Sequence, residues 1–257
     1  MIDLRFEADV RVDESPAGPV VRPPVTRTAT QNTPGPAETV VLYLHSDRYL
    51  SSTGEPVPGS ARRLALRTGA TVVCGRYRPA FPAALEDVYA GYCSSQAAGP
   101  VVVVGERAGA QLAAALLIRL RDSGAPPPRC AVLVSALLDL NMQAPSLRLN
   151  AAADPTFDAD RLRRHVTRYA AGTAPTDPVL SPLRANLHGL PPVQLLVAGT
   201  DLLLDDSLAF AARAARSGVT VDLRVRPDAA SLQAEIVPAM TDFITTWART
   251  TRTPQRA

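Results

Sequence analysis

A charged side chain lies between two glycines in the segment Gly105-Glu106-Arg107-Ala108-Gly109. Four valines precede this segment and a run rich in alanine and leucine follows it, which predicts a strand, a tight turn and a helix. A serine at the centre of a Gly-x-Ser-x-Gly turn is lifted above a parallel sheet and can act as a nucleophile. Arg107 holds that position instead, and an arginine stays protonated and cannot attack a carbonyl. Because Arg107 begins a helix, this turn favours binding of a negatively charged group.

The segments around this turn alternate between apolar runs and helical patterns. Continuous apolar runs such as 40–44 predict strands that are covered on both faces of a parallel sheet. Repeated strand–helix units predict an α/β fold, with a mainly parallel sheet and helices on both faces. We expect strands at 40–44, 70–74, 101–104, 130–134, 193–197 and 219–225, and helices at 61–68, from Pro82, at 107–122, 158–171 and 204–216, and from Pro238.

The length of 257 residues suits a single domain with a sizeable core. Residues 14–38 are rich in proline, glycine and threonine, so we expect 1–38 to be an irregular or edge-strand segment. Residues 139–190 interrupt the alternation of strands and helices. We expect them to form a lid-like insertion near the carboxyl ends of the strands, where ligands bind in such sheets.

Composition excludes several classes of function. The net charge of +3 is too small and too scattered to predict nucleic-acid binding. No apolar run reaches the roughly 18 residues that a membrane span needs, and charges within the N-terminal segment argue against a signal peptide. The cysteines, Cys74, Cys93 and Cys130, predict buried free thiols in a reducing cytoplasm. We expect a cytoplasmic protein that binds a small molecule and needs no metal or cofactor. Whether the protein forms a homodimer stays an open question.

Four motifs occur in an order that resembles a known family. His45-Ser46-Asp47-Arg48-Tyr49 resembles the His-Gly-Gly-Gly-Tyr segment of hormone-sensitive-lipase-like esterases, and segment 76–87 resembles their Asp-Tyr-Arg-Leu-Ala-Pro-Glu segment. The turn at 105–109 is similar to their Gly-x-Ser-x-Gly turn, and segment 199–206 to the one that supplies an acid. The resemblance extends over 39–245 and implies an α/β-hydrolase fold.

The resemblance also implies the three parts of a serine hydrolase, which are a nucleophile, a histidine base and N–H groups for the oxyanion. By this resemblance Arg107 replaces the serine, Asp201 keeps the acid, and Ser231 stands where the histidine would be. No histidine follows His188, and residues 46–48 replace the glycines of the oxyanion loop. The sequence therefore predicts a degenerate catalytic triad.

We predict Asp47, Arg107 and Asp201 as catalytic residues that orient the substrate and move protons. The residues predicted to bind the substrate are His45, Arg48, Glu106, Ala108 and Ser231.

Other interpretations of these residues stay open. Arg107 could form an ion pair with Asp47 or Glu106 and fill the site. Asp201 could be a structural hydrogen-bond acceptor rather than an acid or base, and 47–48 could be a solvated loop. His45 could serve only to orient its own loop.

The predicted losses argue against hydrolysis through a Ser-His-Asp triad. We therefore expect a non-hydrolytic enzyme of the cyclase, lyase or isomerase type, acting on a small, largely apolar metabolite of secondary metabolism. One alternative is a ligand-binding protein or an inactive partner of an active enzyme. A second alternative is an atypical ester hydrolase with another nucleophile, such as Ser231.

Overall fold

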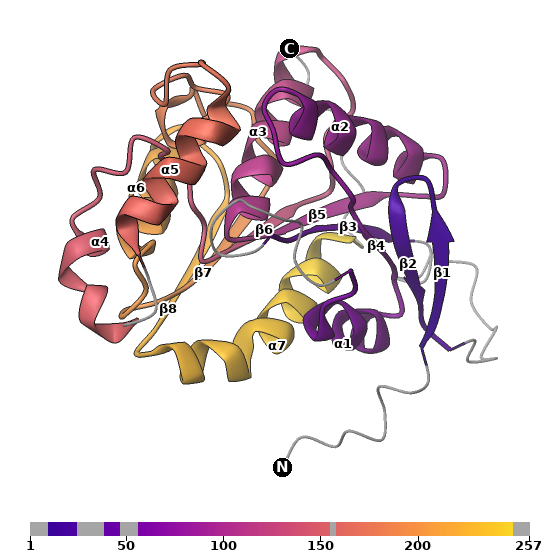
Figure 1. The fold of residues 1–257 in the computed structure, drawn as a ribbon. Helices are drawn as coiled ribbons and strands as arrows, with labels where there is room; N and C mark the ends of the chain where they lie inside the picture. The colour runs from indigo at the N-terminus through magenta and orange to yellow at the C-terminus, as the bar shows by residue number, and fades with distance from the viewer. Residues whose placement is uncertain (1–9, 25–38, 47–55, 155–157, 249–257) are drawn as a thin grey trace.

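One twisted sheet runs through the molecule (Figure 1). The computed structural model describes residues 10–24, 39–46, 56–154 and 158–248. Within these residues eight strands pair in the order β1-β2-β4-β3-β5-β6-β7-β8. The strands are β1 (Arg11–Ser15), β2 (Gly18–Arg22), β3 (Val40–Leu44), β4 (Thr71–Cys74), β5 (Val101–Glu106), β6 (Ala131–Val134), β7 (Val193–Ala198) and β8 (Val221–Arg226). From β4 to β8 all pairs are parallel, whereas β2 pairs antiparallel with both β1 and β4.

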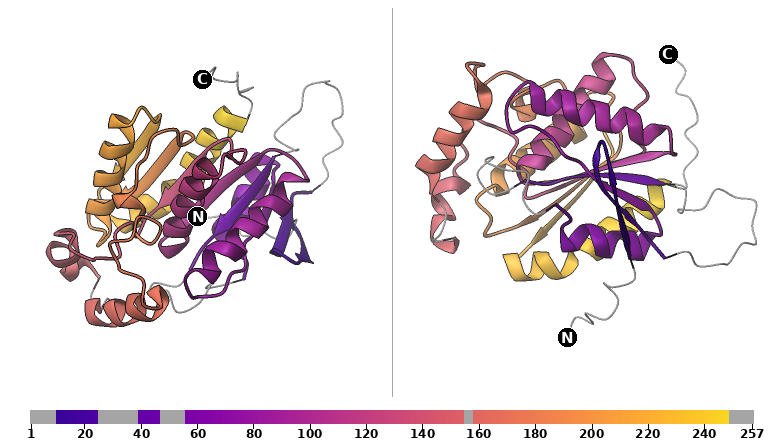
Figure 2. Two further views of the ribbon diagram at one scale, coloured as in Figure 1. Left: turned by 90° about the horizontal axis from the view of Figure 1, so that it is seen from above. Right: turned by 45° about the vertical axis from the view of Figure 1, so that its right-hand side comes forward.

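Helices cover both faces of the sheet and create two separate cores (Figures 1 and 2). On one face α2 (Ala83–Gln96), α3 (Ala108–Asp122) and α6 (Leu204–Arg216) pack against the strands. On the other face lie α1 (Gly59–Thr68) and α7 (Ala229–Ala248). Successive side chains of a strand point to opposite faces, so β3 sends Leu42 to the first core and Tyr43 to the second. The predicted α/β-hydrolase fold is confirmed.

The connection from β6 to β7 is the long irregular part of the fold. It contains α4 (Ser146–Leu149), α5 (Ala159–Ala170) and two short 3₁₀ turns, Ala151–Ala153 and Pro182–Arg184. Figure 2 shows α5 standing outside the layer of helices that covers the sheet. Leu162 of α5 faces inward, because it is buried in the first core.

The last helix differs from the sequence prediction. It begins at Ala229, nine residues before the predicted start at Pro238, and Pro238 lies inside it. The reason is local: the side chain of Asp228 accepts a hydrogen bond from the N–H of Ser231 at 2.8 Å, as a helix N-cap does. The start of α7 is therefore fixed by a capping residue and not by the proline. No helix in the described part of the chain is long and apolar enough to span a membrane.

Candidate active site

Arg107 occupies a strained turn between β5 and α3. Its φ of 57° and ψ of −117° are unfavourable for a residue with a side chain, and its N–H donates to the carbonyl of Val134 at 2.9 Å. The flanking glycines are required by close packing. A Cβ on Gly105 would lie 2.5 Å from the Cα of Ala110, and one on Gly109 would lie 2.2 Å from the carbonyl oxygen of Leu44. The turn therefore holds the side chain at position 107 above the carboxyl end of the sheet.

The charge of Arg107 stays available at this turn. The side chain is exposed, and no carboxylate in the described residues forms an ion pair with it. Glu106 instead accepts hydrogen bonds from the hydroxyls of Tyr43 and Ser60. Burial and the neighbouring Glu106 carboxylate raise the pKa of Tyr43 well above its ordinary value, so Tyr43 stays a hydrogen-bond donor. The alternative pairing of Arg107 with Glu106 is thus not formed, and the other partner considered, Asp47, lies outside the described residues.

Asp201 lies in the loop after β7 and contacts a serine that the sequence prediction missed. The hydroxyl of Ser135 donates to Asp201 Oδ2 at 2.6 Å, and the N–H of Leu203 donates to Oδ1 at 2.9 Å. Ser135 follows β6 directly and has a φ of 45°, so a second strained residue lies beside the first. Its position after a strand of the parallel sheet was the one available signal.

Two cavities meet at Arg107, Asp201 and Ala229. The first has a volume of about 300 Å³ and mixed polar and apolar walls, and we call it the apolar cavity after its leucines; it is lined by Arg107, Ala108, Leu137, Ala153, Asp154, Leu162, Ala198, Thr200, Asp201, Leu202, Leu203 and Ala229. The second has about 270 Å³ and more polar walls; it is lined by Gly59, Ser60, Arg63, Glu106, Arg107, Val134, Ser135, Asp201, Ala229, Leu232, Gln233 and Ile236. A molecule that spans both cavities would pass Arg107, Ser135 and Asp201.

The remaining predicted site residues differ in their positions. Ala108 and Glu106 line one cavity each, whereas Ser231 lines neither and lies in the first turn of α7. His45 is buried; its carbonyl oxygen accepts a hydrogen bond from the hydroxyl of Tyr77 at 2.6 Å, and neither cavity is lined by it. The predicted catalytic Asp47 and its neighbour Arg48 lie outside the described residues, so their roles stay predictions.

The insertion is tied to the loop that carries Asp201. The side-chain amide of Asn150 donates to the carbonyls of Gly199 and Asp201, at 3.0 and 2.8 Å. The hydroxyl of Ser146 donates to the carbonyl of Leu202 at 2.8 Å. These bonds hold one wall of the apolar cavity, contributed by the insertion, against the loop after β7.

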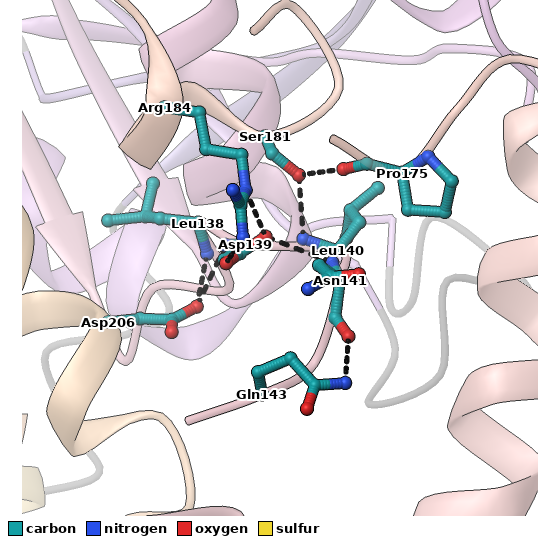
Figure 3. Close-up of polar contacts among 9 residues, drawn as sticks. All are labelled: Leu138, Asp139, Leu140, Asn141, Gln143, Pro175, Ser181, Arg184 and Asp206. Carbon is teal, nitrogen blue, oxygen red and sulfur yellow. Dashed lines mark hydrogen bonds and ion pairs between the residues drawn. The ribbon is translucent and has the colours of Figure 1, made fainter. Parts of the chain in front are cut away.

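A buried carboxylate fixes the start of the insertion (Figure 3). Asp206 accepts hydrogen bonds from the N–H groups of Leu138 and Asp139, at 2.7 and 3.0 Å. Asp139 in turn forms an ion pair with Arg184 at 2.9 Å, and Ser181 accepts the N–H of Leu140 at 2.8 Å. Burial raises the pKa of Asp206 to about 6, the two backbone N–H groups partly offset this, and the charges of Asp139 and Asp205 add to it.

This raised pKa predicts a pH-dependent contribution to stability. Below the ordinary pKa of 3.8 Asp206 is protonated in both the folded and the unfolded state, and the proton is lost from the folded state only near pH 6. The folded state therefore binds this proton more tightly than the unfolded state does. The free energy of unfolding consequently falls as the pH rises from the ordinary pKa of 3.8 through about 6. Asp206→Asn carries no charge, so the unfolding free energy of the wild type should fall by about 2 kcal/mol relative to this variant between about pH 4 and 7. Urea unfolding at several pH values measures this difference, and a constant difference would contradict it.

Comparison with known proteins agrees with the geometry. Residues 41–230 match the model of a family described by its alpha/beta hydrolase fold. The chain is 36% identical over 196 residues to an acetyl-hydrolase of Streptomyces hygroscopicus, over 73% of this chain and 66% of the relative. It is 34% identical over 234 residues to the esterase LipI of Mycobacterium tuberculosis, over 84% of this chain and 71% of the relative. The chain thus spans just under two thirds of the acetyl-hydrolase.

Solved structures of esterases share the fold. A structure of EstE5 soaked with p-nitrophenyl butyrate superimposes with a TM-score of 0.78 at 28% identity, over 94% of this chain and 86% of that one. A structure of an esterase from the bacterial hormone-sensitive lipase family gives a TM-score of 0.77 at 29% identity, over 93% and 85%.

These relatives correct the functional interpretation. The expectation of a non-hydrolytic cyclase, lyase or isomerase was wrong, because the relatives and the structural neighbours are named as acetyl-hydrolase and esterases. The same findings contradict the interpretation of the chain as a hydrolase fold that no longer hydrolyses, and they favour the second alternative, an ester hydrolase. The degenerate triad itself stays a prediction.

Proposed function

Because the chain belongs to the hormone-sensitive-lipase-like branch of the α/β-hydrolase family, we propose that it hydrolyses small carboxylic esters in the cleft at Arg107. The observation that carries the proposal is the 2.6 Å hydrogen bond from Ser135 to Asp201, beside the cation at the strained turn. A serine hydroxyl held by a carboxylate is a nucleophile paired with a base. The site therefore joins the elements of acyl transfer through a serine that is not at the turn, where Arg107 stands.

In the first step the Oγ of Ser135 attacks the ester carbon and its proton passes to Asp201. The carbonyl oxygen becomes an oxyanion, and the guanidinium of Arg107 stabilises that negative charge. When the bond to the alcohol breaks, Asp201 returns the proton to the departing oxygen, and the acyl group stays on Ser135.

In the second step water attacks the acyl-serine and Asp201 accepts its proton. The tetrahedral intermediate collapses, the acid leaves, and the proton returns to Ser135. The N–H of Leu203, bonded to the other carboxylate oxygen at 2.9 Å, keeps Asp201 in one orientation through both steps. A carboxylate is a weaker base than imidazole, so turnover should be slower than in a hydrolase with a histidine base.

The two cavities suggest how an ester would lie. The apolar cavity next to Leu137, Leu162 and Leu202 suits a short acyl chain. The cavity that includes Ser60 and Gln233 suits a more polar alcohol. An ester oriented this way has its carbonyl carbon at the junction of the cavities, next to Asp201 and to Ser135 on the side of the second cavity.

The test is to find the acyl group on the protein. We expect p-nitrophenyl butyrate, the compound soaked into EstE5, to be hydrolysed faster than in buffer, with release of nitrophenol preceding steady turnover. After acid quenching, mass spectrometry should locate a butyryl group on Ser135. A butyryl group on Ser231 would support the rearranged alternative, and absence of both hydrolysis and adduct would refute the proposal.

We further propose that the protein acts in the cytoplasm on a small-molecule ester. Cys74 and Cys130 are buried and free, and Cys93 is exposed and free. Free thiols of this kind are typical of a reducing compartment.

A further inference from the structure

Among the described residues, leucines and a single cation, Arg107, line the apolar cavity. Its lining includes Leu137, Leu162, Leu202 and Leu203, and Arg107 lies at its junction with the second cavity. We propose that this cavity is a binding site for a free short-chain carboxylic acid in its ionised form. The carboxylate contacts the guanidinium of Arg107, and the alkyl chain lies among the leucines.

The guanidinium of Arg107 favours an anion at this place, against the two carboxylates that line the same cavity. No carboxylate in the described parts of the chain forms an ion pair with the guanidinium, so its donors can form two parallel bonds with a ligand carboxylate. Two acidic residues also line the cavity and would repel an anion. Asp201 is already engaged by the hydroxyl of Ser135 and the N–H of Leu203, and Asp154 has an interaction of its own.

The volume of the cavity limits the length of the acid. About 300 Å³ is at the lower end of the volumes of small-molecule sites, so a chain of a few carbons fits and a long fatty acid does not. The second cavity is less suitable for the alkyl chain, because Ser60, Glu106 and Gln233 give it polar walls. The direction of the bound acid is therefore set, with its head at the junction and its chain in the apolar cavity.

A site of this kind has a consequence for catalysis, and this part of the inference rests on the proposed function. The acid released by ester hydrolysis would stay bound at Arg107 and compete with the next ester. Butyrate should then raise the apparent KM of an ester substrate and leave kcat unchanged. Binding of the acid does not depend on turnover, so the two proposals can fail separately.

The test measures binding of sodium butyrate to the full chain by isothermal titration calorimetry, without any ester present. Acetate, propionate, butyrate and pentanoate should bind with increasing affinity, by about fourfold for each added methylene. Butyramide, which has the same shape without the charge, should bind at least roughly tenfold more weakly than butyrate. Arg107→Gln should bind butyrate more weakly than the wild type by at least the same factor. Circular dichroism should verify that this variant is folded.

The control is Arg67→Gln, because Arg67 is exposed on α1 and lines neither cavity. It should bind butyrate as the wild type does. Equal affinity for butyrate and butyramide, or unchanged butyrate binding in Arg107→Gln, would overturn the site. Butyrate binding without ester hydrolysis would uphold the site and refute only the proposed function, and hydrolysis without butyrate binding would do the reverse.

Discussion

Asp201→Asn should lower kcat for p-nitrophenyl butyrate by about 100- to 10,000-fold, because the amide cannot accept the proton of Ser135. The amide oxygen of the asparagine can keep the bond from the N–H of Leu203, while its NH₂ group donates to the hydroxyl of Ser135, so folding should be little affected. Ser135→Ala should cause a loss of similar size. Stopped-flow and steady-state assays of purified variants measure both effects.

The double variant separates a joint role from two independent ones. Residues that act as one unit give non-additive losses, so Ser135→Ala with Asp201→Asn should be hardly slower than either single variant. Asp242→Asn is a matched control, because this aspartate is exposed on α7 and lines neither cavity. If Asp201→Asn kept the wild-type rate, Asp201 would be a structural acceptor and the mechanism would be wrong.

Gly109→Ala should be the most destabilising of the small substitutions discussed. The added Cβ would lie 2.2 Å from the carbonyl oxygen of Leu44 and 2.8 Å from the N of His45, both of which are backbone atoms. Neither atom can move without shifting β3, so the free energy of unfolding should fall by about 3 kcal/mol or more. Thermal and urea unfolding measure it.

Gly91→Ala is the control for this substitution. Gly91 lies inside α2, and the nearest atom to its new Cβ is 3.8 Å away, which is ordinary contact. Because alanine favours a helix more than glycine does, this variant should be more stable than the wild type by about 0.5–1 kcal/mol. Similar losses in the two glycine variants would show that the turn tolerates a side chain at position 109.

Local patterns predicted most of the fold. The apolar run at β3 and the glycines at 105 and 109 determine strands and a turn through contacts between near neighbours. The start of α7 was missed, because Pro238 was given more weight than the cap at Asp228. A capping residue three positions before Ser231 was the better signal.

The site was harder to predict, because its partners are distant in sequence. Ser135 and Asp201 are 66 residues apart and belong to no shared motif, so only the pairing of β6 with β7 brings them together. The same holds for Asp206, which is 68 residues from Leu138. The replacement of the serine by Arg107 is visible in the sequence, but the proximity of Ser135 to Asp201 is not. The expectation of a non-hydrolytic enzyme was wrong because it did not include this second serine.

The turn that carries Arg107 also has an evolutionary meaning. Its backbone geometry depends on glycines 105 and 109, whereas the side chain at 107 is exposed and packs into neither core. Mutation can therefore exchange a nucleophile for a cation at this position without loss of the scaffold. A substitution at this position can therefore change the chemistry of the cleft while the contacts that hold the fold stay the same.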